Sequence, residues 1–446
     1  MKKRKYIKPL IKQVNPTFMD KYGGSVKDFR IRKEIDGYPV EELTKKYGSP
    51  LFVFSEKDIE EKYKELITAF KSRYPKFKLG WSYKTNYLNE ICKIYHKLGS
   101  IAEVVSEFEY EKARKLGIDG QDIIFNGPYK PKEALKTAVL EGAKIHIDHW
   151  YEINDLEEIA KELDINIPVA IRTNMDIGVY PQWNRFGFNI DNGEAYAAIK
   201  RIYEGKRLYL TGLHTHIGTF MLSPEPYKVA AEEIMKLKNL IEKDFGYKIE
   251  YIDLGGGFAS KNRLKGVYQP PEIIVPNIEE YAEAITTGIM ENLEGKEPPL
   301  LYLETGRHLI DEAGYLLTTV WAEKLLPNGV KSYIVDAGIN LLYTAFWYNF
   351  KIEINNKKDS FLYPSIINGP LCMNIDVLAE NIELPPLDRG DILTLSPVGA
   401  YSVTQWMQFI RYRPSVILIR KDGKIDLIRR SEKLEDITTP EIDTKF

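Results

Sequence analysis

The sequence predicts an α/β protein in which a (β/α)8 barrel of the TIM type is followed by a second, mostly antiparallel β domain. From about residue 77, apolar strand-like runs alternate regularly with helical patterns, and eight such runs precede residue 304. After about residue 315 the helical patterns thin out and strand-like runs dominate. The 446 residues are enough for a barrel of about 250 residues and one further domain.

The expected barrel strands are eight apolar runs separated by helical patterns: 77–83, 101–105, 122–125, 144–147, 168–172, 208–214, 249–254 and 300–303. The clearest helix follows Ser223 and Pro224, a suitable N-cap and first helical residue, and keeps one apolar stripe through Ala230, Ile234, Leu237, Ile241 and Phe245. Pro131 begins another helix. A strand followed by a helix eight times is typical of a barrel, and an open doubly wound sheet is the alternative.

The last third of the chain predicts the β domain, with strands at 331–335, 391–395, 416–420 and 424–428. The last two flank Lys421-Asp422-Gly423, and an Asp-Gly pair is a strong hairpin signal. We therefore expect a barrel domain over residues 51–314 and a β domain over 315–446. Residues 1–50 are too few for a domain and should pack on one of the two.

Composition excludes several classes of protein. The chain has 62 basic and 64 acidic residues, so no basic excess indicates a nucleic-acid partner. The basic start (Lys2 to Lys8) is not followed by the apolar run of roughly 7–15 residues that marks a signal peptide. No run approaches the roughly 18 consecutive apolar residues of a membrane-spanning helix. With only Cys92 and Cys372, we expect a cytoplasmic protein without disulfides.

Polar and glycine residues follow the predicted strands at the end where a barrel carries its chemistry. Lys84 follows an apolar run, and a desolvated lysine can form a Schiff base, although most lysines are simply solvated. The glycines 255–257 either form a tight turn or let backbone N–H groups approach a phosphate. Arg307 suits a phosphate or a structural ion pair, and Glu304 precedes it.

His214 and His216 are two residues apart, so both point to one face of a strand. A zinc site would need further ligands at suitable spacing, which the sequence does not offer, so we expect no metal. A flat imidazole stacked on a planar cofactor is the alternative. Together the lysine, glycines, arginine and carboxylate predict pyridoxal phosphate as the cofactor.

At this point the sequence resembles the fold type III pyridoxal-phosphate decarboxylases, above all their diaminopimelate decarboxylase branch, with ornithine decarboxylases as more distant relatives. The resemblance spans about residues 45–435. Its markers are Tyr83-Lys84-Thr85-Asn86, Glu103-Val-Val-Ser106, His216-Ile-Gly-Thr219, Gly255-Gly-Gly-Phe258, Glu304-Thr-Gly-Arg307, Gly369-Pro-Leu-Cys372 with Asp376, and Gly399-Ala-Tyr401. The resemblance implies an alanine racemase-like barrel and an amino acid decarboxylase.

The resemblance also implies roles for individual residues. Lys84 would bind the cofactor aldehyde, His216 would stack on the pyridine ring, and Glu304 would bond the ring nitrogen. The phosphate would be surrounded by Gly255, Gly256, Gly257, Gly306, Arg307, Thr219 and Tyr401. Cys372 and Asp376 would enter the site from the partner subunit of a homodimer, with Cys372 as general acid. Arg307, Met373, Asp376 and Tyr401 would contact the amino acid substrate.

Two departures from the family bear on the substrate. Met373 stands where diaminopimelate decarboxylases have a glutamate, and the segment from Asp336 to Trp347 lacks their arginine, with Thr344 near its place. Without this glutamate and this arginine, the enzyme would bind the distal amino acid head group of the substrate more weakly, by several kcal/mol, unless Arg411 or Arg413 replaces them.

The sequence therefore predicts a diaminopimelate decarboxylase-like enzyme that converts meso-diaminopimelate to L-lysine. A related decarboxylase acting on carboxynorspermidine, a basic amino acid or a carrier-bound amino acid is the alternative. A racemase is opposed by Glu304, because family racemases place an arginine at the ring nitrogen. A non-catalytic regulatory homologue is a minor alternative.

Overall fold

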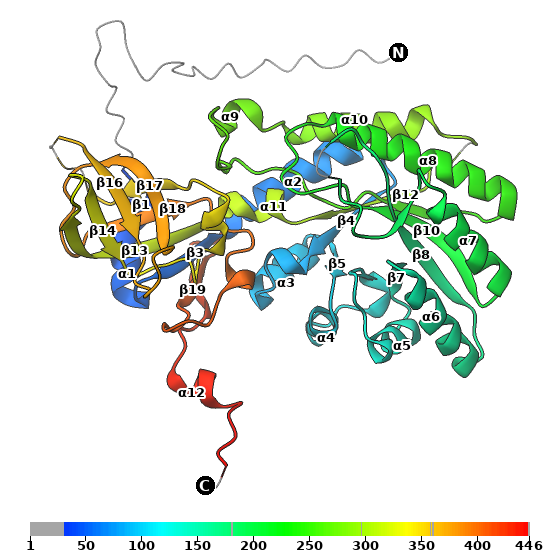
Figure 1. Ribbon diagram of the computed structural model, residues 1–446, viewed down its shortest axis with the longest axis horizontal. Helices are drawn as coiled ribbons and strands as arrows, with labels where there is room; N and C mark the ends of the chain where they lie inside the picture. The colour runs from blue at the N-terminus through cyan, green and yellow to red at the C-terminus, as the bar shows by residue number, and fades with distance from the viewer. Residues whose placement is uncertain (1–30, 180–181, 296, 357, 359–360, 445–446) are drawn as a thin grey trace, which may run out of the picture.

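The computed structural model describes residues 31–179, 182–295, 297–356, 358 and 361–444, and these form two lobes side by side (Figure 1). One lobe is a barrel ringed by helices and the other is built mainly of strands. Near the C-terminus, the segment that carries α12 (Leu434–Thr438) projects away from both lobes.

The barrel is closed by eight parallel strands, which confirms the predicted fold class over the open-sheet alternative. The sheet runs in the order β10-β11-β12-β4-β5-β6-β7-β8, and β10 also pairs with β8, which closes it. A short strand, β9 (Phe188–Asn189), extends β8. The barrel strands are β4 (Phe77–Ser82), β5 (Ile101–Val104), β6 (Ile123–Phe125), β7 (Lys144–Ile147), β8 (Ile167–Asn174), β10 (Leu208–Thr215), β11 (Tyr251–Asp253) and β12 (Leu300–Thr305).

The strands are joined by amphipathic helices whose apolar faces pack on the barrel. The longest, α8, begins at Glu225, because Pro224 is its N-cap, one residue later than the sequence predicts. It ends at Gly246, whose positive φ of 70° stops the helix. The other helices of this lobe are α2 (Glu56–Lys71), α3 (Asn89–Lys97), α4 (Glu107–Lys115), α5 (Lys132–Leu140), α6 (Trp150–Leu163), α7 (Glu194–Gly205), α9 (Pro271–Ile274), α10 (Ile278–Glu291) and α11 (Arg307–Ile310).

The second lobe is a mostly antiparallel sheet, as predicted. Its main path is β17-β16-β14-β13-β3-β19-β20, and β18 pairs with β13 and β15. Only β14 with β16 and β3 with β19 run parallel among the described pairs. The expected hairpin joins β19 to β20, with Gly423 at a φ of 84°. The strands are β13 (Gly314–Leu325), β14 (Lys331–Val335), β15 (Lys351–Ile354), β16 (Tyr363–Asn368), β17 (Val377–Leu384), β18 (Ile392–Ser396), β19 (Ser415–Ile419) and β20 (Ile425–Arg429).

The strand β3 (Leu51–Ser55) belongs to this second sheet. The predicted barrel domain, which begins at residue 51, had included it. It pairs with β13 and β19. The described residues before it, β1 (Glu34–Ile35), β2 (Tyr38–Pro39) and α1 (Val40–Tyr47), pack their apolar side chains on the same sheet. Residues 1–30 of the expected N-terminal segment lie outside the described residues.

The two lobes are tied together beside the carboxyl ends of the barrel strands. The backbone carbonyl of Thr85, after β4, accepts the N–H of Tyr401 from the β lobe at 2.9 Å. The buried carboxylate of Asp311 accepts the N–H of Ala400 at 3.2 Å. No helix among the described residues is both long and apolar enough to cross a membrane.

Candidate active site

A cavity of about 520 Å³ lies at the carboxyl ends of the barrel strands, where it also meets the β lobe. Its lining includes six residues that the sequence singles out: Lys84, His216, Thr219, Glu304, Arg307 and Tyr401. These come from both lobes and, within the barrel, from the ends of three strands, β4, β10 and β12. The structure therefore brings together most of the predicted cofactor site in one place.

Lys84 enters the cavity from a 3-10 turn, Tyr83–Thr85, directly after β4. Its Nζ lies 2.8 and 2.7 Å from the two carboxylate oxygens of Glu103 on β5. Burial alone would lower the pKa of Lys84, but the carboxylates of Glu103 and Glu304 outweigh it and raise that pKa. The amine is therefore held as an ammonium in the absence of a reaction partner.

Arg307 begins the short helix α11 directly after β12 and points into the same cavity. Its guanidinium carbon lies 4.8 to 5.5 Å from the ring centres of Tyr401, Tyr348 and Phe220. Among the described residues its Nε and Nη1 have no hydrogen-bond partner, although Nη1 lies 3.9 Å from an oxygen of Asp311. A buried guanidinium with free donors is a site for an anion.

The glycine loop after β11 has no room for side chains. A Cβ at Gly256 would lie 2.3 Å from the carbonyl oxygen of Glu304, and one at Gly257 would lie 2.2 Å from that of Gly218. Gly255 and Gly257 have φ values of 65° and 93°. The glycines thus allow this loop to pack closely against neighbouring backbone, but they are not in the cavity lining.

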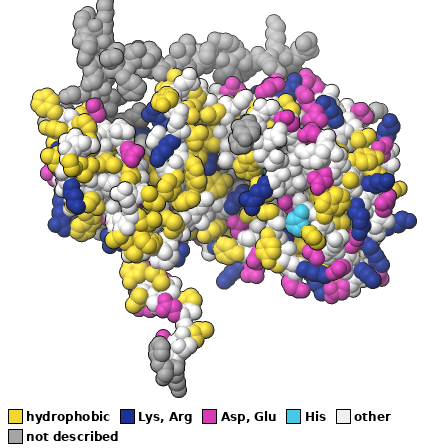
Figure 2. Space-filling model, in the orientation of Figure 1, with side chains coloured by type: hydrophobic (Ala, Val, Ile, Leu, Met, Phe, Trp, Pro, Cys, Tyr) yellow, Lys and Arg dark blue, Asp and Glu magenta, His cyan; other side chains and the backbone are white. Residues whose placement is uncertain are grey.

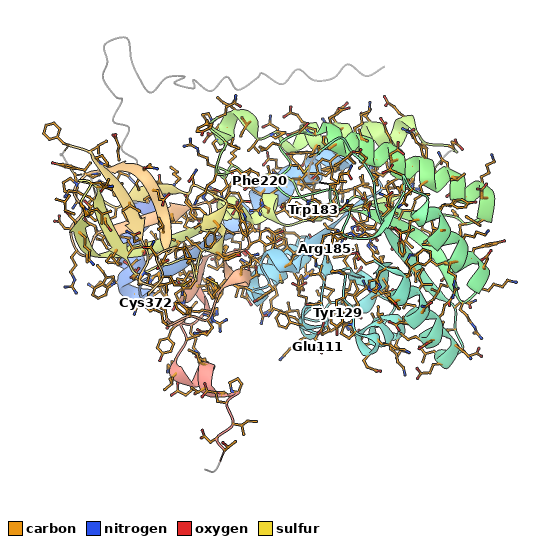
Figure 3. The ribbon with its side chains drawn as sticks, in the orientation of Figure 1. Glu111, Tyr129, Trp183, Arg185, Phe220 and Cys372 are labelled. Atoms are coloured by element: carbon orange, nitrogen blue, oxygen red, sulfur yellow. The ribbon has the colours of Figure 1, made fainter. Side chains whose placement is uncertain are left out.

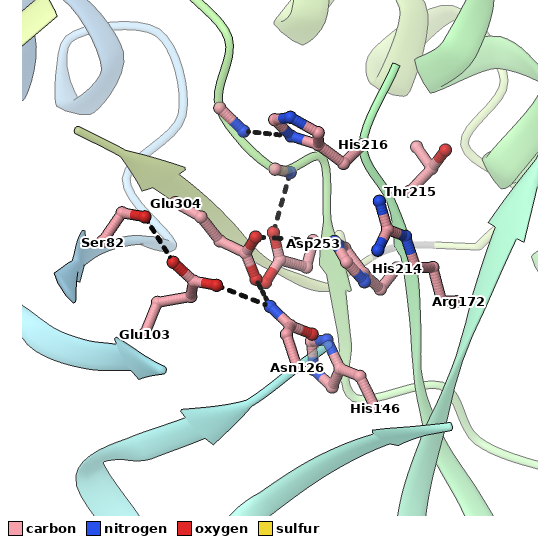
Figure 4. A network of polar contacts seen from close by, with 12 residues as sticks. Ser82, Glu103, Asn126, His146, Arg172, His214, Thr215, His216, Asp253 and Glu304 are labelled. Carbon is pink, nitrogen blue, oxygen red and sulfur yellow. Dashed lines mark hydrogen bonds and ion pairs between the residues drawn. The ribbon is translucent and has the colours of Figure 1, made fainter. Parts of the chain in front are cut away.

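Two N–H groups of this loop bind protein side chains. Gly255 donates to Asp253 at 2.9 Å, and Gly256 donates to Nδ1 of His216 at 3.0 Å (Figure 4). Nδ1 of His216 is therefore an acceptor. Burial, with Arg172 and Lys84 close by, lowers the pKa of His216 well below its usual value, so its ring is neutral. A fixed, neutral imidazole suits stacking on a planar ring.

Glu304 lies at the base of the cavity within a network of polar side chains (Figure 4). The side-chain amide of Asn126 donates to one of its oxygens, and Nε2 of His214 lies 3.5 Å from the other. Burial would raise the pKa of Glu304, but His214 and Lys84 hold it well below the usual value. Glu304 is therefore a carboxylate that faces the cavity.

The structure also gathers metal-ligand types around His214 that spacing in the sequence did not reveal. Atoms of His146, His214, Asp253 and Glu304 lie within 4.8 Å of one another, all buried. They come from four strands, β7, β10, β11 and β12, so only the closed barrel brings them together.

Three predicted site residues of the β lobe, like the predicted glycines, lie outside the cavity lining of this chain. Cys372 is exposed on the β lobe, and Met373 follows it (Figure 3). Asp376 is 2% exposed, and its carboxylate accepts the N–H groups of Ile339 at 2.8 Å and Leu371 at 2.7 Å. Within this chain Asp376 thus stabilises the loop that carries Cys372, rather than facing a substrate.

The two arginines that could replace a missing charge are also distant from this cavity. Arg413 pairs with Glu432 at 2.5 Å, and Arg411 lines a separate cavity with Gln408, Ile410 and Tyr412. Neither lines the cavity that holds Lys84.

A group of uncharged side chains in the cavity lining, which we call the outer wall, was mostly missed by sequence reasoning, which singled out only Thr344 and the Val105 of the Glu103–Ser106 marker. This wall is largely aromatic: Val105, Pro128, Trp183, Phe186, Phe220, Leu264, Thr344, Trp347, Tyr348 and Gln405. Most of these residues stand in long loops or in the β lobe, where strand ends give no signal. The T-shaped contact of Trp183 with His216, at 5.2 Å, could not be read from spacing.

The residues fit pyridoxal phosphate when tested on their own geometry. A lysine amine, a buried carboxylate and a guanidinium with unpaired donors line one cavity, and a fixed neutral imidazole lies among them. These are the donors that an aldehyde, a ring nitrogen, a phosphate and a planar ring require.

Comparisons with known proteins agree with this chemistry. Residues 56–311 match the family described as "Pyridoxal-dependent decarboxylase, pyridoxal binding domain". The chain is 32% identical to the diaminopimelate decarboxylase of Methanocaldococcus jannaschii, over 92% of this chain and 94% of that protein. It is 30% identical to that of Aquifex aeolicus, over 92% and 95%. The crystal structure of the M. jannaschii enzyme with L-lysine superposes with a TM-score of 0.85, covering 94% of this chain and 97% of that one, at 31% identity.

Proposed function

We propose that this chain, which belongs to the family of pyridoxal-dependent decarboxylases, removes one carboxylate of meso-diaminopimelate to release L-lysine and carbon dioxide. The observation that carries the proposal is the cavity in which Lys84, Glu304 and Arg307 converge. Relatives that span nearly the whole chain and are named diaminopimelate decarboxylases support the substrate.

Each group of the cavity has a distinct task in this reaction. Pyridoxal phosphate, when bound, takes up the electron pair that departing carbon dioxide leaves behind. Lys84 would bind its aldehyde, Glu304 would accept a hydrogen bond from its protonated ring nitrogen, and His216 would cover one face of its ring. Arg307, with Thr219 and Tyr401 beside it, binds the phosphate. The ionised state of Glu304 keeps the ring nitrogen protonated, which favours decarboxylation.

A proton must return to the carbon that loses its carboxylate, and we assign this step to the thiol of Cys372 from a second copy of the chain. Cys372 is exposed and does not line the cavity of its own chain. Figure 2 shows hydrophobic side chains gathered over the β lobe, whereas charged ones cover the barrel. In the β lobe, Phe346, Trp347 and Ile375 are 40 to 53% exposed, which is typical of an interaction surface and supports a homodimer.

The uncharged outer wall supports a second candidate, a decarboxylase whose substrate lacks a distal carboxylate. The charged lining residues are Lys84, Glu103, Arg172, Glu304 and Arg307. Lys84 pairs with Glu103, and Arg172 pairs with Asp148. No charged side chain of this chain's lining is left for a second amino acid head group. A basic amino acid or a carrier-bound amino acid would fit this wall.

The deciding experiment measures carbon dioxide and L-lysine released from meso-diaminopimelate by the cofactor-loaded enzyme. Turnover of about 1 per second or faster, ordinary for an enzyme on its own substrate, is expected. Lys84→Ala should release neither product. If loaded enzyme gives only traces, diaminopimelate is not the substrate, and basic and carrier-bound amino acids are tested in the same assay.

We also place the protein in the cytoplasm, since both cysteines are free thiols.

A further inference from the structure

Beneath Glu304, two carboxyl groups and two imidazoles are enclosed within the barrel. His146 and His214 are each 1% exposed, Asp253 is fully buried, and Glu304 is 6% exposed. The mechanism above uses Glu304 alone. The other three need an explanation, because burying titratable groups is costly unless their interactions are satisfied.

The donors around this cluster converge on Glu304 rather than on Asp253. Glu304 receives the amide of Asn126, has Nε2 of His214 at 3.5 Å, and faces the ammonium of Lys84 across the cavity. Asp253 receives only the N–H of Gly255 on one oxygen, and its other oxygen has no hydrogen-bond partner among the described residues. Two neighbouring buried carboxyl groups do not both stay ionised, so one of them holds a proton.

His214 is the imidazole of this cluster that pairs with Glu304. Its ring packs against that of His146, with the ring centres 4.8 Å apart, and His146 in turn contacts the hydroxyl of Tyr251 at 3.1 Å. Neither nitrogen of His214 has a hydrogen-bond partner among the described residues, so the nitrogen facing Glu304 is not engaged elsewhere.

We propose that His214 is a positioning residue that keeps the negative charge on Glu304 and leaves the shared proton on Asp253. His214 touches neither substrate nor cofactor in this role, and it acts through Glu304 on the ring nitrogen. Burial and the charge of Glu304 also raise the pKa of Asp253, in agreement with this distribution of charge. The proposal rests on the proposed function, because it concerns the group that Glu304 binds.

The test compares cofactor binding by apoprotein prepared from the wild-type enzyme and from His214→Leu and His214→Gln variants. Two probes are titrated: pyridoxal phosphate, and its analogue with carbon in place of the ring nitrogen. His214→Leu should weaken binding of pyridoxal phosphate by roughly ten- to a hundredfold. This is the range for losing a hydrogen bond to a charged group, here the bond between the ring nitrogen and ionised Glu304. Binding of the analogue should be nearly unchanged, since it offers Glu304 no nitrogen.

The remaining variants separate positioning from structural support. His214→Gln, which retains an N–H donor, should recover most of the preference for pyridoxal phosphate over the analogue. His146→Leu removes a ring that packs on His214 but makes no hydrogen bond or ion pair with Glu304 among the described residues, and should reduce the preference less. In loaded His214→Leu enzyme we expect kcat to fall with KM little changed.

Equal loss of both probes in His214→Leu would overturn the proposal, because a structural role lowers both alike. Stoichiometric zinc in the purified apoprotein would also overturn it, since the cluster would then be a metal site. Failure of wild-type apoprotein to bind either probe would overturn the proposed function as well, and so is distinguishable from failure of this inference alone.

Discussion

The two oxygens of Glu103 hold the Lys84 ammonium at 2.8 and 2.7 Å, and this pair governs how readily the lysine can bond an aldehyde. Only the neutral amine is nucleophilic, and Glu103 raises the pKa of Lys84. Glu103→Gln should therefore speed capture of pyridoxal phosphate by apoprotein near neutral pH, by roughly tenfold for each unit that the pKa falls. Stopped-flow absorbance of the bound cofactor measures this rate.

Ser82→Ala is the matched control, because Ser82 donates to the same carboxylate at 2.5 Å without adding or removing charge. Its capture rate should stay close to that of the wild-type protein. An unchanged rate in Glu103→Gln would show that deprotonation of Lys84 does not limit capture.

Single residues at strand ends were predictable, because parallel strands in a barrel deliver their carboxyl ends to one rim. Lys84, Glu304 and Arg307 follow β4 or β12 and were found in this way. Trp183 and Tyr348 were not, since they come from a long loop and from the other lobe. Contacts between segments that are far apart in the sequence place Trp183 and Tyr348 in the cavity lining, and no local sequence pattern predicts such contacts.

Among the elements, α4 carries a buried acid in its first turn. Glu109 accepts the N–H of Val105 at 2.9 Å while its own N–H donates to Ser106 at 3.2 Å, so the two side chains cap the helix. Burial raises the pKa of Glu109 to about 7. As pH rises from about 4.5 to about 7, the unfolded chain releases this proton before the folded one, so stability falls through that window.

Glu109→Gln should remove this loss and keep an oxygen for the N–H of Val105. We expect the variant to be more stable than the wild type near pH 8 by about 1–3 kcal/mol, with a smaller difference near pH 5. Thermal unfolding at both pH values measures the effect. The exposed neighbour Glu107, changed to Gln, should show no such dependence on pH. A wild-type advantage at pH 8 would contradict the assignment.

The eight barrel strands were predictable as elements, since their apolar runs are short and bounded by turn residues. In the β lobe only β14, β18, β19 and β20 were predicted, whereas β3, β13, β15, β16 and β17 were not. The sheet to which a strand belongs was harder to predict. The run Leu51–Ser55 is wholly buried, and its sequence is compatible with either lobe. Its partners, β13 and β19, lie far along the chain, so only tertiary pairing placed it in the β lobe.

In the whole molecule, the position of Cys372 on the β lobe leads to a prediction about the assembly. Its loop is fixed by Asp376, and its thiol is outside the cavity of its own chain (Figure 3). If a partner's thiol completes each cavity, the Lys84→Ala and Cys372→Ala lesions affect different sites in a mixed dimer. One site then carries both lesions and the other carries neither.

Each variant alone should therefore be nearly inactive, with Cys372→Ala lowered by roughly 10²–10⁴-fold, the contribution of a general acid. Unfolding the two variants together and refolding them should restore a clear fraction of wild-type carbon dioxide release. Mixing each variant with itself under the same conditions is the control for refolding. Because a site built within one chain always keeps one lesion, inactivity of the refolded mixture, when the wild type refolds to full activity, would rule out the shared site.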